Sequence, residues 1–154
     1  DPHIGVFGVL AVIGVCLLKT AAFGQLALAQ AWCWIGIPLI ISRTLQVQLI
    51  VTFPSARAGG GTAGGFIRDA RPLHLASALI LAAGLCFLAG GVLACGLLAG
   101  ACVFGIVAGL WMRRVFGGVT GDLLGWASEV VETALLFGTA FFAAHLTAWP
   151  WKSF

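Results

Sequence analysis

Residues 73–111 read LHLASALILAAGLCFLAGGVLACGLLAGACVFGIVAGLW, a run of 39 residues that contains no Asp, Glu, Lys or Arg. A helix crosses the hydrocarbon core of a bilayer with about 20 residues, so this run is too long for one crossing and long enough for two. The pair Gly90 and Gly91 stands near its middle, and glycine readily adopts the backbone angles of a turn. We therefore predict two membrane spans, 73–89 and 92–111, joined by a tight turn at this pair.

Three further apolar runs flank these two spans, at 4–29, 32–53 and 123–149. Hydrophobic residues make up 61% of the chain and charged residues only 8%, against roughly 25% charged residues in a soluble domain. So few charges cannot cover a water-soluble surface, whereas lipid tails solvate apolar side chains without penalty. The sequence thus predicts an all-α, polytopic membrane helix bundle with about five transmembrane helices, forming a single transmembrane domain over residues 1–154.

Basic residues are unevenly distributed between the two ends of this predicted bundle. Lys152 lies at one end, whereas the loops at the other end carry Arg57, Arg68, Arg71, Arg113 and Arg114. Loops rich in Lys and Arg stay in the cytoplasm. We therefore expect both arginine-bearing loops, and the chemistry that they carry, on the cytoplasmic side.

The segment 113–132, RRVFGGVTGDLLGWASEVVE, concentrates polar residues between the last two spans. Glycines let a backbone approach an anion closely, a helix start presents free N–H groups, and arginines supply charge for phosphate oxygens. Asp122, Glu129 and Glu132 recur at helical spacing on one face, where carboxylates could hold a divalent cation. We predict these three as catalytic residues; the alternatives are a helix cap for Asp122 and structural ion pairs for the glutamates. The predicted phosphate-binding residues are Arg57, Arg68, Arg113, Arg114, Gly117, Gly118, Thr120 and Gly121.

Two basic residues, Lys19 and Arg43, fall inside predicted spans. Arg43 lies near the middle of its span, at about the depth expected of Glu132. An unpaired charge at that depth is costly, so we expect a structural ion pair between Arg43 and Glu132 or Glu129. Lys19 is nearer the outer side, and we expect its amine to reach toward the membrane surface.

Glycines also pattern the fourth predicted span, where Gly96, Gly100, Gly105 and Gly109 include two G-x-x-x-G pairs. Such pairs let two helices pack closely, and we interpret them as a packing seam. The partner helix belongs either to this chain or to another subunit, so a homo-oligomer stays open.

The loop 57–66, RAGGGTAGGF, lacks the Lys-Ser/Thr of a phosphate-binding P-loop and follows no predicted strand. It is either a plain linker or, because arginines flank it, a mobile lid over an anionic substrate.

The expected partners are the lipid bilayer and a small-molecule substrate, with no nucleic acid.

The run 113–132 resembles the signature of the cobalamin synthase family, the adenosylcobinamide-GDP ribazoletransferases, in which Gly-Gly-x-Thr-Gly-Asp-x-x-Gly leads into a helix with spaced glutamates. Two further stretches agree in order and spacing, DPHIGVFGVLAV at 1–12 and ISRTLQVQLIVTFPSARAGGGTAGGF at 41–66. The resemblance covers the whole chain. It implies a magnesium-dependent enzyme of the bacterial cytoplasmic (inner) membrane that joins α-ribazole, or its 5′-phosphate, to adenosylcobinamide-GDP with release of GMP.

The family's aspartate-rich motif, Asp-Gly-x-Ala-Asp-Thr-x-Asp, belongs upstream of Asp1 and is absent from this sequence. With the missing initiator methionine, this leads us to expect the C-terminal part of a longer protein, inactive by itself. Asp1 and Asp122 are the metal ligands expected within the chain, and Mg²⁺ is the expected cofactor.

Two other functions stay open. In a transporter or channel subunit, Arg43, Glu129 and Glu132 would line a path across the membrane. A lipid-head-group phosphotransferase would share the metal-dependent chemistry but use a different acceptor. A transporter needs polar groups near the midplane with access from both sides, whereas the loop arginines and Asp122 gather at one face, which favours an enzyme.

Overall fold

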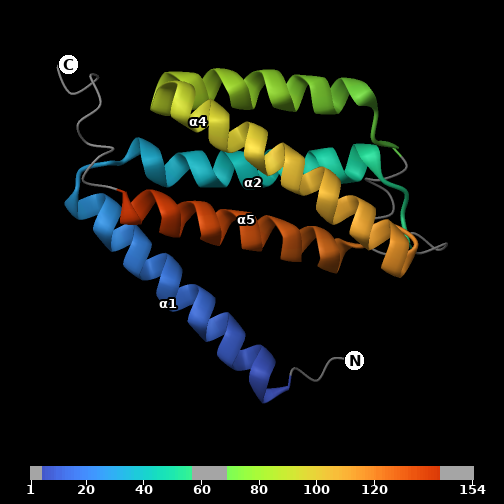
Figure 1. Cartoon of the computed structure of the whole chain (residues 1–154), viewed down its shortest axis with the longest axis horizontal. Helices are drawn as coiled ribbons and strands as arrows, with labels where there is room; N and C mark the ends of the chain where they lie inside the picture. Colours follow the sequence, from blue (N-terminus) through green and yellow to red (C-terminus); the bar gives the residue numbers. More distant parts are fainter. Residues whose placement is uncertain (1–4, 57–68, 143–154) are drawn as a thin grey trace.

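The computed structural model describes residues 5–56 and 69–142, and within these ranges the chain is helical. The helices are α1 (Val6–Leu28), α2 (Cys33–Thr52), α4 (Pro72–Phe116) and α5 (Gly121–Phe141) (Figure 1). Of these, α1, α2 and α4 are long and apolar enough to cross a membrane. The predicted all-α membrane bundle is confirmed for this part of the chain. The last predicted span, 123–149, corresponds to α5 as far as Phe141, and its remaining residues from 143 lie outside the described ranges.

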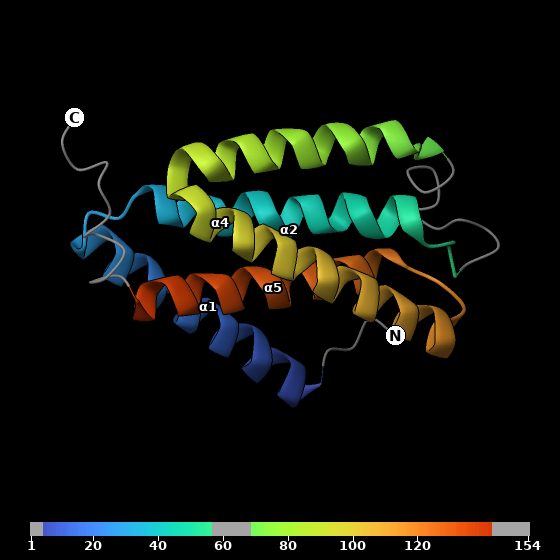
Figure 2. The ribbon, with the colours of Figure 1, turned by 45° about the horizontal axis from the view of Figure 1, so that its top comes forward.

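The long helix α4 is a helical hairpin. Its 45 residues are interrupted at Gly91, where φ is 62° and ψ is −149°, a backbone conformation that is essentially reserved for glycine. A methyl group on the buried Gly90 would clash with Ile37, so small size is needed here as well as freedom of rotation. The two limbs, 72–90 and 92–116, therefore run back from the same end of the bundle, as Figures 1 and 2 show. The predicted turn at Gly90 and Gly91 is confirmed.

Helix α2 is the centre of the bundle. Its side chains Ile37, Ile41, Leu45 and Leu49 are almost completely buried, and it packs against both α4 and α5. The first limb of α4 lies beside α2, while the second limb crosses over α2 and α5 (Figure 1). Helix α1 packs mainly on α5 and diverges from it toward its own N-terminal end (Figure 2). As a result, most of α1 faces the surroundings with apolar side chains, which suits contact with lipid.

The predicted glycine seam is confirmed for one of its two halves. Methyl groups on Gly105 and Gly109 would clash with Leu45 and with the Phe53 ring, so these glycines let the second limb of α4 approach α2 closely. A partly buried hydrogen bond from Gln48 Nε2 to the Cys102 carbonyl oxygen (3.0 Å) strengthens the same contact. Gly96 and Gly100, in contrast, have open space around them.

Candidate functional site

Two loops meet at the end of the bundle where α2 and the second limb of α4 terminate. The Val119 N–H donates to the Pro54 carbonyl (2.8 Å), and the Ala56 N–H donates to the Val119 carbonyl (3.0 Å). These bonds form an isolated parallel bridge between Ser55 and Val119, and Val119 is fully buried. The loop that follows α2 is thereby fixed to the loop that precedes α5. This places the segments that flank the predicted phosphate-binding loops at one end, as the charge pattern predicted.

Two glycines make this loop contact sterically feasible. Gly117 ends α4 in the left-handed conformation, with φ of 80°, which favours glycine. Gly118 is buried, and a side chain there would clash with the Pro54 carbonyl oxygen and the Ala56 nitrogen. The backbone conformation at Gly117 and the close packing at Gly118 therefore explain why glycine stands at these two positions. Their predicted role in binding phosphate stays a prediction.

The start of α5 carries a polar cap and an acidic residue in its first turn. Thr120 is its N-cap, and the hydroxyl oxygen accepts a bond from the Leu123 N–H (3.4 Å). Gly121 and Asp122 are exposed in the first turn, where the helix N-terminus favours a negative charge. Arg113 and Arg114 are exposed in the last turn of α4, one short loop away. Thr120 therefore caps the helix, and Asp122 lies exposed in its first turn.

Deeper in the bundle, three helices share one ionic cluster. Lys19 Nζ of α1 lies 2.5 Å from Glu129 Oε1 and 2.6 Å from Glu132 Oε1 on α5. The Ser42 hydroxyl of α2 donates to the other oxygen of Glu132, at 3.0 Å. The Glu132 side chain is 9% exposed and that of Glu129 is 51% exposed. We call Lys19, Ser42, Glu129 and Glu132 the ionic cluster; it corrects the expectation that Lys19 extends to the membrane surface.

Arg43 does not take the place predicted for it. The expected ion pair between Arg43 and Glu132 or Glu129 is wrong for the described structure. Lys19 contacts both carboxylates, and the Ser42 hydroxyl donates to the second oxygen of Glu132. Arg43 follows Ser42 directly, so its side chain points about 100° away around α2. It is exposed and donates from Nη1 to Gln46 Oε1 (3.1 Å).

The polar residues that connect these charges were not predicted from the sequence. Gln46 Nε2 donates to the Ser128 hydroxyl on α5 at 2.8 Å, so Arg43, Gln46 and Ser128 form a chain of contacts from α2 to α5. Ser42 and Gln46 are spaced by four residues, as are Ser128 and Glu132. Hydroxyl and amide side chains at this spacing inside apolar helices are the signal that could have identified the network.

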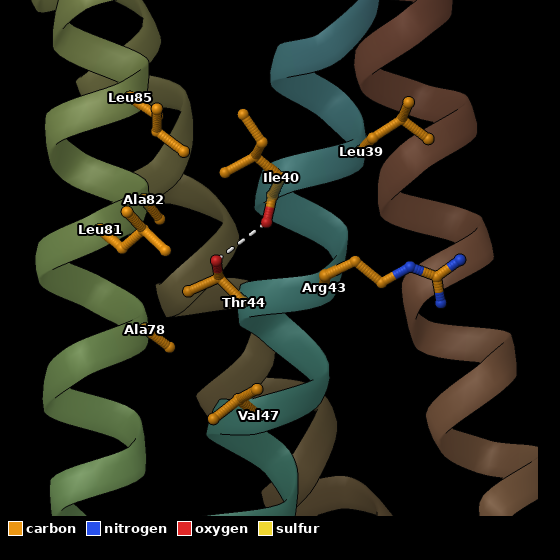
Figure 3. Close-up of a pocket in the computed structure, with 9 residues that line it drawn as sticks. All are labelled: Leu39, Ile40, Arg43, Thr44, Val47, Ala78, Leu81, Ala82 and Leu85. Carbon is orange, nitrogen blue, oxygen red and sulfur yellow. Dashed lines mark hydrogen bonds between the residues drawn. The ribbon is translucent and has the colours of Figure 1, made fainter.

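An apolar groove of about 390 Å³ lies between α2 and the first limb of α4. Figure 3 shows Arg43 at its edge, with the guanidinium pointing away from the groove and toward α5. The residues that line it are Leu39, Ile40, Arg43, Thr44, Val47, Ala78, Leu81, Ala82 and Leu85.

The residues expected to bind metal or phosphate are only partly within the described ranges. Asp1, Arg57 and Arg68 lie outside them. Residues 5–56 and 69–142 contain no group of three His, Cys, Asp or Glu side chains placed to hold a metal ion. Asp122 is therefore the one predicted metal ligand that the described structure positions, and its role stays a prediction.

Comparison with known proteins identifies the family. Residues 1–140 match the family model described as cobalamin-5-phosphate synthase. The chain belongs to this family. Proteins named adenosylcobinamide-GDP ribazoletransferase are 44% identical in Chlorobaculum tepidum, over 88% of this chain and 54% of the relative, and 42% identical in Chlorobaculum parvum, over 91% and 56%. A relative of the same name from Desulforamulus reducens is 36% identical over 89% of this chain and 55% of its own length.

The chain spans about half the length of these synthase-family relatives. No solved structure matches it. The family match agrees with the resemblance seen in residues 113–132.

Proposed function

We propose that the complete protein is a membrane transferase that joins α-ribazole, or its 5′-phosphate, to adenosylcobinamide-GDP with release of GMP, at the bacterial cytoplasmic membrane and with its active face toward the cytoplasm. The observation that carries this proposal is the family match over residues 1–140, together with relatives that bear the name adenosylcobinamide-GDP ribazoletransferase.

The reaction exchanges one phosphorus–oxygen bond for another. A ribose hydroxyl of α-ribazole attacks the phosphorus next to cobinamide, the anhydride bond to the second phosphorus breaks, and GMP leaves. The hydroxyl proton passes to a base or to water. Charge on the phosphate oxygens must be stabilised throughout, because positioning and electrostatics supply most of the catalysis in phosphoryl transfer.

The loop end of the bundle supports this chemistry. Arg113 and Arg114 are exposed one loop away from the N-terminus of α5, and that terminus carries the exposed Asp122. Guanidinium groups suit phosphate oxygens. The bridge between Ser55 and Val119 holds the two loops together, so groups from both can act on one substrate.

At this end of the molecule, the protein and the substrate phosphates could together supply the ligands of a magnesium ion. Mg²⁺ is commonly bound through one or two carboxylates plus substrate phosphates, so an exposed Asp122 is a suitable partner even without a cage of protein ligands. When bound, the ion neutralises charge that develops on the phosphate oxygens. We assign Asp122 to hold the ion, with Asp1 as the second expected ligand.

The ionic cluster argues against a transport path through the same residues. A path needs accessible charges, whereas Glu132 is buried and both of its oxygens have partners in α1 and α2. A lipid-head-group phosphotransferase differs from the proposed enzyme in its acceptor, which is an experimental question.

The experiment is a turnover assay on the complete protein, purified in maltoside micelles with MgCl₂. Adenosylcobinamide-GDP and α-ribazole should give a cobamide product and GMP in equal amounts, measured by chromatography. A matched reaction replaces α-ribazole with glycerol phosphate or another lipid-head-group alcohol. GMP release with such an alcohol and none with α-ribazole would overturn the proposal.

A further inference from the structure

Arg43 lies at the middle of α2 and yet is exposed. The 20 residues of α2 make a helix about 30 Å long, which matches the hydrocarbon core of a bilayer. Arg43 is ten residues from the start of this helix and nine from its end, whereas long cationic side chains reach the membrane surface only near helix ends. A charge at this depth almost always faces the interior of a helix bundle, because lipid tails do not solvate it. The face of α2 that carries Arg43 is therefore one that the described helices leave uncovered.

The apolar groove beside Arg43 has the composition of a surface on which a helix packs. It lies between α2 and the first limb of α4. Ala78 and Ala82 line its α4 side at a spacing of four residues, and small residues at this spacing let another helix approach closely. Leu81 and Leu85 stand beside them, 64% and 41% exposed. The groove thus suits the apolar side chains of a helix.

Much of a protein of the relatives' size lies outside this chain. The chain spans 54–56% of the length of the synthase-family relatives described above. We propose that the groove and the Arg43 face bind a transmembrane helix from the part of the complete protein that this chain does not span, and that this helix carries an Asp or Glu at the depth of Arg43. The inference concerns how the complete protein assembles, so it does not depend on the reaction proposed above.

Charge complementarity is the reason for an acidic partner. Arg43 Nη1 donates to Gln46 Oε1, and the Gln46 amide donates in turn to the Ser128 hydroxyl. These contacts hold the guanidinium beside the groove and toward α5 (Figure 3), but a neutral amide does not balance its charge. A carboxylate accepts two N–H groups of a guanidinium side by side. A lipid phosphate is less suitable, because it stays outside the hydrocarbon core in whose middle Arg43 lies.

The first test is photo-crosslinking of the complete protein in liposomes. The photoreactive residue p-benzoylphenylalanine replaces Leu81 at the groove, and in a matched control it replaces Val103, which is 62% exposed near the middle of the second limb of α4. After irradiation, mass spectrometry of the digested protein should show the probe at Leu81 joined to an apolar peptide from outside residues 1–154. The probe at Val103 should react with lipid, because neither a charge nor a groove marks that face.

The second test finds the carboxylate. Arg43→Gln should lower the melting temperature of the complete protein in micelles by roughly 5–15 °C, because it leaves a buried carboxylate without its countercharge. Arg114→Gln, at an exposed arginine in the last turn of α4, is the control and should change it little. Each Asp and Glu in the apolar spans outside residues 1–154 is then changed to Asn or Gln. One of these changes, combined with Arg43→Gln, should cost less than the sum of the two single changes.

Several outcomes would overturn the inference. They are a probe at Leu81 that reacts with lipid alone, with a second copy of the protein or with another part of residues 1–154, and equal capture of outside peptides from Leu81 and Val103. Additive losses with every outside carboxylate would overturn it as well. If Arg43→Gln fails to fold, Arg43→Lys takes its place in the cycle, and the crosslink decides independently. None of these readouts uses turnover, so failure here leaves the proposed function intact.

Discussion

Lys19 of α1 contacts the carboxylates of both Glu129 and Glu132 on α5, at 2.5 and 2.6 Å. Helix α1 has little other buried surface in the described structure, with Ala22 and Leu26 as its buried residues. Ser42 adds α2 to the same cluster through Glu132. One lysine thus fixes the position of α1 against the two helices that carry the predicted polar site.

Loss of Lys19 should destabilise the protein strongly. Lys19→Met leaves the buried Glu132 without its countercharge, and breaking a buried pair from one side costs about 3–5 kcal/mol. Lys19→Met combined with Glu132→Gln should be less destabilised than the sum of the two single variants, because the double variant leaves no unpaired charge at Glu132. The measurement is a double-mutant cycle of the free energy of unfolding in micelles.

The half-exposed Glu129 supplies the internal control for this cycle. Lys19→Met with Glu129→Gln should show a smaller coupling than the cycle with Glu132→Gln, since solvent or lipid headgroups can screen Glu129. Additive losses at Glu132, within about 0.5 kcal/mol, would refute a cooperative cluster.

Two glycines of α4 should respond in opposite ways to the same substitution. Gly109→Ala places a methyl group against the Phe53 ring and should cost about 1–3 kcal/mol. Gly100→Ala is on the same limb but faces open space, and alanine favours helix, so its stability should be unchanged or slightly higher. Equal losses of thermal stability at both positions would contradict the close contact between α2 and the second limb of α4 at Gly109.

The orientation of the bundle is testable by cysteine labelling. We expect Asp69→Cys, at the arginine-bearing end, to react with a membrane-impermeant maleimide only after cells are permeabilised. Trp32→Cys, at the opposite end and 64% exposed, should react in intact cells. Both variants need a background in which the native cysteines are replaced, since Cys16 and Cys33 are exposed. Labelling of Asp69→Cys in intact cells would reverse the predicted topology.

The sequence predicted those features of the fold that depend on length and composition. A 39-residue apolar run exceeds one bilayer thickness, so the turn at Gly90 and Gly91 followed from arithmetic. The glycine pair near the middle of the run predicted where the turn falls, and the structure shows at Gly91 backbone angles that favour glycine.

The sequence could not decide which charges pair inside the bundle. Lys19 and Glu132 each lie nine residues before the end of their helices, and Arg43 lies ten residues after the start of α2, so depth alone does not distinguish the two cations. The choice depends on how each helix is rotated and on which helices are neighbours. Those are properties of packing, and the spacing of residues within one helix does not contain them.

We propose that the loop end, with Asp122, carries magnesium-dependent ribazole transfer in the complete protein. Asp122→Asn keeps the size of the side chain and leaves the Thr120 cap intact, but it removes the charge that a magnesium ion requires. Because Asn also matches Asp in shape and can keep hydrogen bonds, the variant should fold. Its effect on transfer should come from the metal and not from the helix terminus.

The measurement is GMP release by the complete wild-type protein and by Asp122→Asn in micelles, across a range of MgCl₂ concentrations. Circular dichroism and thermal unfolding confirm that both are folded. We predict that Asp122→Asn loses at least about 90% of transfer at magnesium concentrations that saturate the wild type, and that higher magnesium partly restores it. Near-normal transfer by the folded variant, with the same magnesium dependence as wild type, would contradict the account.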